Sequence, residues 1–203
     1  MALSTADSNK IPKIKRDDKL VTRLLPVLIV GSEHSLDNES RLYLRSLVRL
    51  VDKSVYEYEL ARKHILEELE TGDRLEYRLI IINHLENSIN AVNRVMKTLD
   101  IILNGKKDTV AKKTILSNFN LLDTIDDSIL NHIQSYSVSA LRNRIEHLDE
   151  DIFDNKASGG LFADVDESYK NICVQGRCLP ISEFVSSIEA SHNLVLMILG
   201  NLK

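Results

Sequence analysis

An arginine and a histidine are the residues of this chain best suited to catalysis. Arg142 and His147 stand in the run Arg-Asn-Arg-Ile-Glu-His, inside a stretch with helical periodicity. A histidine can transfer protons near neutral pH, and a guanidinium stays charged and presents planar donors that match phosphate oxygens. The pair therefore suits cleavage of RNA, where the 2'-hydroxyl loses a proton while negative charge builds on the phosphoryl oxygens.

Two polar neighbours can support this pair. Asn143 lies four residues before His147 and can orient the imidazole, and Glu146 lies four residues after Arg142 and can steady the guanidinium. At about 100° per residue, Arg142 and His147 fall on opposite flanks of one helix. A single helix does not bring both groups to one atom, but two copies of the helix can, so we expect a homodimer.

The run resembles the R-x4-6-H motif of HEPN domains, in which a polar residue follows the arginine, here Asn143. Many proteins of that family are metal-independent ribonucleases. The resemblance implies that two motifs face each other across a homodimer, and that cleavage leaves 2',3'-cyclic phosphate ends or the derived monophosphate. Carried over, Arg142 and His147 are catalytic, Asn143 supports them, and no metal or cofactor is needed.

The same resemblance implies a setting in toxin-antitoxin or defence systems. The expected partner is a cognate antitoxin of the nucleotidyltransferase type. Other HEPN proteins are only helical scaffolds, so the alternative is a non-catalytic interaction protein. Acidic residues on the same stretch favour that alternative because they repel phosphate; they are Glu146, Asp149, Glu150, Asp151 and Asp154.

In the alternative, Arg142–Glu146 and Arg144–Asp151 are ordinary surface charge pairs, worth about 0.5 kcal/mol or less each.

Other candidate sites are weaker. Glu189 and His192 match half of the paired Glu-x-x-His pattern of di-iron bundles, but no second copy exists. His192 falls on an apolar stripe and is expected to pack in the core. His64 and His84, on two predicted helices, have no partner at metal-ligand spacing and are expected at the surface.

The only two cysteines, Cys173 and Cys178, face each other across a predicted β-hairpin. We expect both to be reduced and packed as small apolar residues. A cross-strand disulfide is the alternative, and it would close too short a loop to add much stability.

The composition predicts one helix-rich domain. The chain has 203 residues, of which 43% are hydrophobic and 28% charged, with only 7 Gly and 3 Pro. A net charge of -4 argues against a large basic surface for nucleic acid. The apolar run 24–30 is too short to span a membrane, which needs about 20 residues. We therefore expect a soluble, cytoplasmic protein with a flexible tail over residues 1–15 and one domain over residues 16–203.

The apolar spacing predicts an all-α bundle of about five or six helices with a small β-hairpin before the last helix. Two long helices, 36–70 and 73–103, are expected to fold back on each other around Thr71-Gly72. The motif falls on a further long helix near residues 123–152. The remaining elements are an entry helix at 17–30 that alternatively becomes extended after Pro26, a short helix at 108–117, a hairpin at about 168–181 and a last helix at 182–199.

Overall fold

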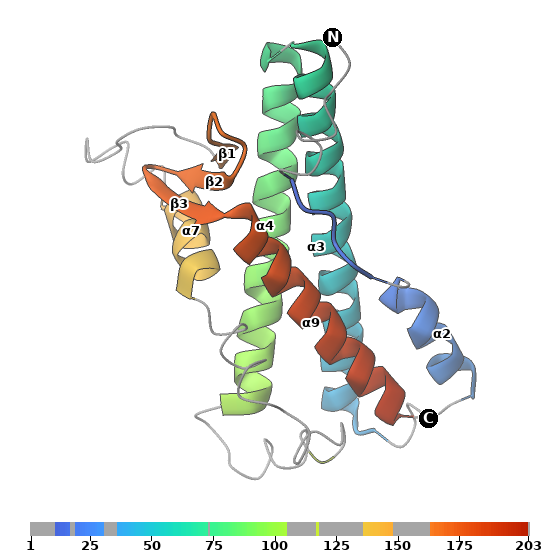
Figure 1. Ribbon diagram of the computed structural model, residues 1–203. Helices are drawn as coiled ribbons and strands as arrows, with labels where there is room; N and C mark the ends of the chain where they lie inside the picture. The colour runs from blue at the N-terminus through green and yellow to red at the C-terminus, as the bar shows by residue number, and fades with distance from the viewer. Residues whose placement is uncertain are drawn as a thin grey trace.

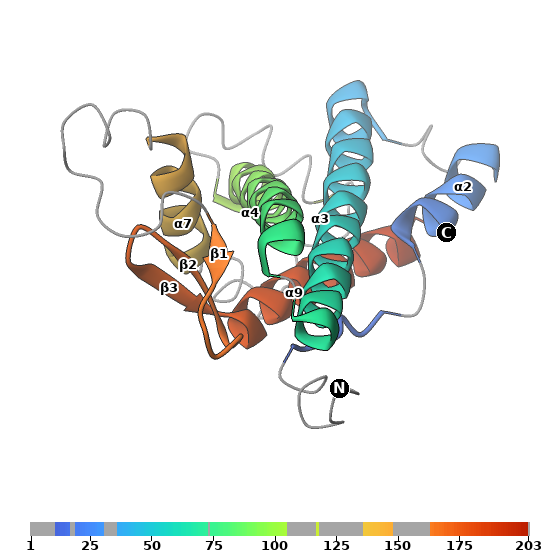
Figure 2. The same ribbon diagram turned by 90° about the horizontal axis from the view of Figure 1, so that it is seen from above.

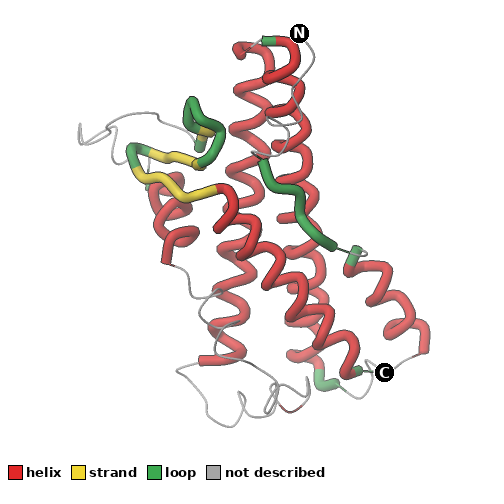
Figure 3. The backbone as a smooth tube through the Cα atoms, viewed as in Figure 1, coloured by secondary structure: helices red, strands yellow, loops and turns green. Residues whose placement is uncertain are grey.

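A computed structural model describes residues 11–16, 19–30, 36–72, 74–104, 117, 136–147 and 163–202. Within these residues the chain is mostly helical, and its strands form one small sheet (Figures 1 and 3). The helices are α2 (Leu20–Val30), α3 (Asn38–Thr71), α4 (Arg74–Asn104), α7 (Tyr136–Glu146) and α9 (Ile181–Asn201). The strands are β1 (Asp164–Val165), β2 (Asn171–Val174) and β3 (Arg177–Pro180). The predicted fold class, a helical bundle with a small sheet before the last helix, is confirmed.

The two long helices α3 and α4 form an antiparallel hairpin (Figure 1). The buried Ser88 hydroxyl of α4 donates to the Ser54 carbonyl of α3 at 2.8 Å. The turn between them follows from Gly72, which adopts a left-handed conformation with φ of 76° and donates its amide to the Glu68 carbonyl at 2.8 Å. Such a cap ends a helix because glycine alone takes this conformation without a Cβ penalty.

The apolar spacing from Leu75 to Leu103 in the sequence predicts a buried stripe on α4, and this prediction is correct over most of the helix but wrong near its start. Leu85, Ile89, Val92, Met96 and Leu99 are buried as expected. Leu79 is instead 68% exposed, and Ile81 is fully buried. The 3.6-residue period of a helix drifts away from a fixed spacing over many turns. The spacing of Asp73 and Glu76 predicts a cap at Asp73, which lies outside the described residues.

The last helix crosses the hairpin and closes the core (Figure 2). The helical spacing of the sequence predicts one apolar stripe for this helix, and all five of its positions are buried: Val185, Ile188, His192, Val195 and Leu199. Near its start, Phe184 packs edge-on against Tyr58 of α3, with ring centroids 6.1 Å apart. The core therefore lies between the hairpin and α9, where burial of large apolar side chains stabilises the fold.

The entry segment is helical through Pro26, so the extended alternative for residues 27–30 is wrong. The carboxylate of Asp52 accepts from the amides of Leu20 and Val21 at 3.0 and 2.9 Å. This contact caps α2 from another helix, because the first amides of a helix lack partners within it. Leu20, Leu24 and Val27 are buried.

The segment before α2 does not behave as the expected flexible tail over residues 11–15. Ile11 and Ile14 are buried. The Tyr58 hydroxyl donates to the Pro12 carbonyl at 2.6 Å, and Arg62 Nε donates to the Ile11 carbonyl at 3.0 Å. These contacts fix the segment on α3, and they depend on residues about fifty positions away in the sequence.

The predicted β-hairpin is present, and a third strand joins it. β2 pairs with β3 in the expected register, with Cys173 opposite Cys178, and β1 adds to the other edge of β2. Gln175 and Gly176 form the turn with φ of 48° and 74°. Positive φ at both positions is typical of the two-residue turns whose twist matches paired strands.

The expectation that both cysteines are reduced is wrong for this structure. Cys173 and Cys178 form a disulfide, with an S–S distance of 2.01 Å. Their side chains leave the same face of the sheet at directly opposed positions, so the register alone brings the two sulfur atoms together.

Two predicted helices fall wholly or partly outside the described residues. Of the helix expected at 108–117, only residue 117 is described, and it is helical. Of the motif helix expected near 123–152, the described part is α7 and the turn at His147.

Candidate functional site

Helix α7 presents the motif on its outer side. Its inner side packs on α4 and the sheet through the buried Val138 and Leu141, with Ile145 partly buried. Asn143 and His147 are exposed, and Arg142 is partly exposed. The spacing of apolar residues thus turns the motif toward solvent, where a substrate or a second copy of the chain can reach it.

The guanidinium of Arg142 is held by its neighbours on the helix. It forms an ion pair with Glu146 one turn later, and its Nη1 donates to Asn143 Oδ1 at 3.3 Å. The ion pair has the four-residue spacing from which the sequence predicts that Glu146 steadies Arg142, and that role stays a prediction. The predicted role of Asn143 in orienting His147 also stays a prediction, and the Asn143 side-chain oxygen accepts from Arg142.

His147 lies in the turn directly after α7, and its amide donates to the Asn143 carbonyl at 3.0 Å. This hydrogen bond continues the helical pattern by one residue. The imidazole is therefore carried at the carboxyl end of the helix.

Arg144 was expected to pair with Asp151, which lies outside the described residues. Its Nη1 donates to Gln175 Oε1 in the hairpin turn at 3.3 Å. Arg144 therefore links α7 to the sheet.

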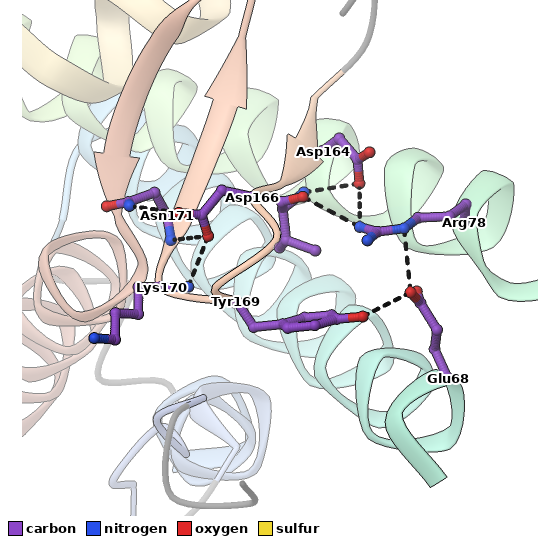
Figure 4. Close-up of polar contacts among 8 residues, drawn as sticks. Glu68, Arg78, Asp164, Asp166, Tyr169, Lys170 and Asn171 are labelled. Carbon is purple, nitrogen blue, oxygen red and sulfur yellow. Dashed lines mark hydrogen bonds and ion pairs between the residues drawn. The ribbon is translucent and has the colours of Figure 1, made fainter. Parts of the chain in front are cut away.

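A second polar cluster joins the tip of the α3–α4 hairpin to the sheet (Figure 4). The buried carboxylate of Glu68 accepts from the Tyr169 hydroxyl at 2.8 Å and lies 3.3 Å from Arg78 Nε. Arg78 also contacts Asp164 Oδ1 at 2.6 Å, and its guanidinium lies 5.5 Å from the centre of the Tyr169 ring. A buried carboxylate needs such partners to remain charged. We interpret this cluster as structural, because its groups are engaged with one another.

Asp166 organises the loop between β1 and β2 (Figure 4). Partial burial alone would raise its pKa, but hydrogen bonds from the Asn171 and Ser168 side chains and from the amides of Asn171 and Lys170 lower the pKa to about 2. The amides donate at 3.1 and 2.9 Å. Hydrogen bonds to the charged form stabilise it.

Three histidines outside the motif are placed as follows. His192 is buried in the core, as expected. His64 and His84 stack in parallel across the α3–α4 interface at 5.9 Å, with side chains only 18% exposed, so the surface placement is wrong. Each Nδ1 lies within 2.8 Å of a glutamate, Glu67 or Glu57.

Within the described part of the chain, no three His, Cys, Asp or Glu side chains are grouped in a way that could hold a metal ion.

Comparison of the chain with protein-family models, with curated proteins and with solved structures found no match. Among the described helices, none is both long enough and apolar enough to cross a membrane. The function proposed below is therefore inferred from the motif residues of α7.

Proposed function

We propose that this protein is a metal-independent endoribonuclease whose catalytic groups are Arg142 and His147. The observation that carries the proposal is their common exposure at the carboxyl end of α7, whose inner side is buried on α4. Two groups with complementary chemistry are thus accessible from solvent, on different flanks of one helix. The HEPN-like motif Arg142-Asn143-x3-His147 adds support to this assignment.

In the proposed reaction, His147 accepts the proton of the 2'-hydroxyl, and the 2'-oxygen attacks the adjacent phosphorus. The bond from phosphorus to the 5'-oxygen breaks, and that oxygen takes a proton from a solvent water molecule as it leaves. Arg142 donates to the phosphoryl oxygens as their charge increases. The products carry a 2',3'-cyclic phosphate and a 5'-hydroxyl.

We further propose that the active form is a homodimer. Arg142 and His147 lie five residues apart on α7 and the turn that follows it, so they point to different flanks of the helix. A second copy of α7, facing the first, would supply an arginine to the histidine of its partner. RNA would then bind in the cleft between the two copies.

The proposal is tested by comparing RNA cleavage by the wild type with cleavage by Arg142→Ala and His147→Ala. Each substitution should reduce kcat/KM by at least about 100-fold, the usual contribution of general acid-base catalysis or of one charge-stabilising donor. Arg94→Ala removes an exposed arginine from α4 and is the matched control, expected to cleave like the wild type. Undiminished cleavage by folded Arg142→Ala and His147→Ala proteins would overturn the assignment.

A second candidate function is a non-catalytic interaction protein in which the exposed side of α7 binds a partner. The ion pair between Arg142 and Glu146 favours this alternative, because the carboxylate competes with phosphate for the guanidinium. This function predicts no RNA cleavage at any salt concentration or pH, together with a stable complex or a self-associated state. Failure to recover either one from native extract or by mass measurement would count against it.

A further inference from the structure

A basic pocket of about 450 Å³ lies between α2 and α3, and this volume is within the range of small-molecule sites. Helix α2 lies on the opposite side of the hairpin from α7 (Figures 1 and 2). Positively charged residues of two segments line it: Arg16 and Lys19 before α2, and Arg45, Arg49 and Lys53 on α3.

The charge of this pocket is opposite to that of the whole chain. Its lining holds these five cationic side chains and one carboxylate, Asp52, whereas the chain carries a net charge of -4. Asp52 is already engaged by the first amides of α2, and Arg16 pairs with Glu59 at 3.1 Å. Within the described residues, Lys19, Arg49 and Lys53 have no carboxylate at ion-pair distance.

The spacing of the cations on α3 destabilises this helix through electrostatic repulsion. Arg45, Arg49 and Lys53 follow at intervals of four residues and therefore lie on one side of α3. Like charges at this spacing repel one another. An anion bound between them would remove this repulsion, and planar guanidinium groups match phosphate oxygens in particular.

The remaining lining is apolar or aromatic. Val21, Leu24 and Val48 form this part, and Tyr56, which is 57% exposed, stands at its edge. A ligand that combines a phosphate group with a small apolar part would fit both sets of residues. The mixture of a few charged groups and apolar walls is typical of small-molecule sites.

We propose that the pocket between α2 and α3 binds a small phosphorylated molecule with at least two negative charges. Its phosphate oxygens accept hydrogen bonds from Lys19, Arg49 and Lys53, and its apolar part contacts Val48 and Tyr56. A small soluble ligand is favoured over a polymer because cations from the segment before α2 and from α3 converge on one pocket.

Isothermal titration calorimetry with inorganic pyrophosphate tests the proposal at constant ionic strength. The wild type should bind. The double variant Arg49→Gln and Lys53→Gln should bind at least about tenfold more weakly, the change expected from losing charge-assisted hydrogen bonds. Lys97→Gln, an exposed lysine of α4, is the matched control and should bind like the wild type. The Tm of the double variant should be equal or higher, because repulsion on α3 is relieved.

Failure of the wild type to bind pyrophosphate, or equal binding by the double variant, would overturn the proposal. The single variant Arg49→Gln serves the same purpose if the double variant does not fold. Two further titrations use vesicles containing phosphatidic acid and a single-stranded RNA oligonucleotide. If either of these binds in a manner sensitive to the substitutions while pyrophosphate does not, the pocket serves a lipid headgroup or an RNA backbone, and the proposed small ligand is wrong.

Discussion

At the scale of single residues, Arg142 is held by the same carboxylate that would compete with a substrate. Glu146 pairs with the guanidinium, and Asn143 accepts a further hydrogen bond from it. These contacts fix the orientation of a long side chain before any phosphate arrives. They also reduce the positive charge available to the phosphate, so the balance between orientation and competition can be measured.

Glu146→Gln keeps the shape of the side chain and removes its charge. Under the ribonuclease proposal, we expect the KM for RNA to fall by roughly two- to threefold, because an exposed ion pair at this spacing is worth about 0.5 kcal/mol. Steady-state cleavage assays at low salt measure this change. Glu70→Gln, an exposed glutamate of α3, is the control. A higher KM would mean that Glu146 mainly orients Arg142 and does not mainly compete with phosphate.

Asp166 should make the stability of the folded protein depend on pH in the acid range. Its pKa is lowered from 3.8 to about 2 in the folded chain. A lowered pKa stabilises the fold above pH 4, and this contribution is lost as the pH falls from about 4 toward 2. Asp166→Asn should therefore be less stable than the wild type at pH 5 and equally stable near pH 2.

Thermal unfolding of both proteins between pH 2 and 5 checks this expectation. Glu167→Gln changes the next residue, which is exposed, and should follow the wild type throughout. A difference between Asp166→Asn and the wild type that is constant across the range would contradict the assigned hydrogen bonds.

At the scale of elements, helix ends depend on single residues. Gly72 terminates α3 in a left-handed conformation, with φ of 76° and no atom near the position of a Cβ. Gly72→Ala should lower the free energy of unfolding by about 1 kcal/mol, because a Cβ is unfavourable in this conformation. Urea unfolding measures the change. Gly200→Ala lies inside α9 without a positive φ and should leave stability unchanged or raised. Equal effects of the two substitutions would contradict the role of Gly72 in ending α3.

The disulfide belongs to the hairpin of β2 and β3. Thiol counting on denatured protein should find no free thiol before reduction and two after it, since Cys173 and Cys178 are bonded and are the only cysteines. Replacing both by serine should cost at most about 2 kcal/mol, because the closed loop is short. Two free thiols in the untreated protein would contradict the bond.

The sequence predicts the long helices well because a buried helical face repeats its apolar residues over many turns. It predicts the β2–β3 hairpin because Gln175-Gly176 is a turn signal between apolar runs. β1 has only two residues and is defined by its pairing with β2, so it carries no pattern of its own. The exposed motif side of α7 was predictable, but the basic pocket was not, because its cations come from separate segments.

At the scale of the whole molecule, the N-terminal segment joins the hairpin to the last helix. Tyr58 donates to the Pro12 carbonyl, and the Lys15 amide donates to Glu189 of α9 at 2.6 Å. Burial raises the pKa of Tyr58 well above its usual value, so the hydroxyl remains a donor at any ordinary pH. Residues 11–16 thus act as a strap between two elements that are distant in sequence.

Tyr58→Phe removes only the hydroxyl of this strap. We expect the free energy of unfolding to fall by about 1 kcal/mol, because the partly buried Pro12 carbonyl loses its donor. Tyr56→Phe is the matched control, since that ring is exposed two residues earlier on α3. Chemical unfolding of both variants measures the difference. An equally small effect of the two substitutions would show that the hydrogen bond from Tyr58 to residues 11–16 contributes little to the free energy of unfolding.

The hairpin of α3 and α4 separates two surfaces with different proposed roles, the motif side of α7 and the basic pocket beside α2 (Figure 1). The proposed ribonuclease depends on the first surface and on a second copy of the chain. Its cleavage rate per mole of protein should therefore rise with protein concentration in the range where the solution mass changes from monomer to dimer.

End-group analysis of RNA tests the proposed metal-independent ribonuclease most directly. The RNA is incubated in EDTA with the wild type and with His147→Ala, and the solution mass of both proteins is recorded. Fragments that carry 2',3'-cyclic phosphate ends, formed by the wild type alone, are the predicted result. Intact RNA in the presence of a folded wild-type dimer, or equal cleavage by folded His147→Ala protein, would contradict the claim.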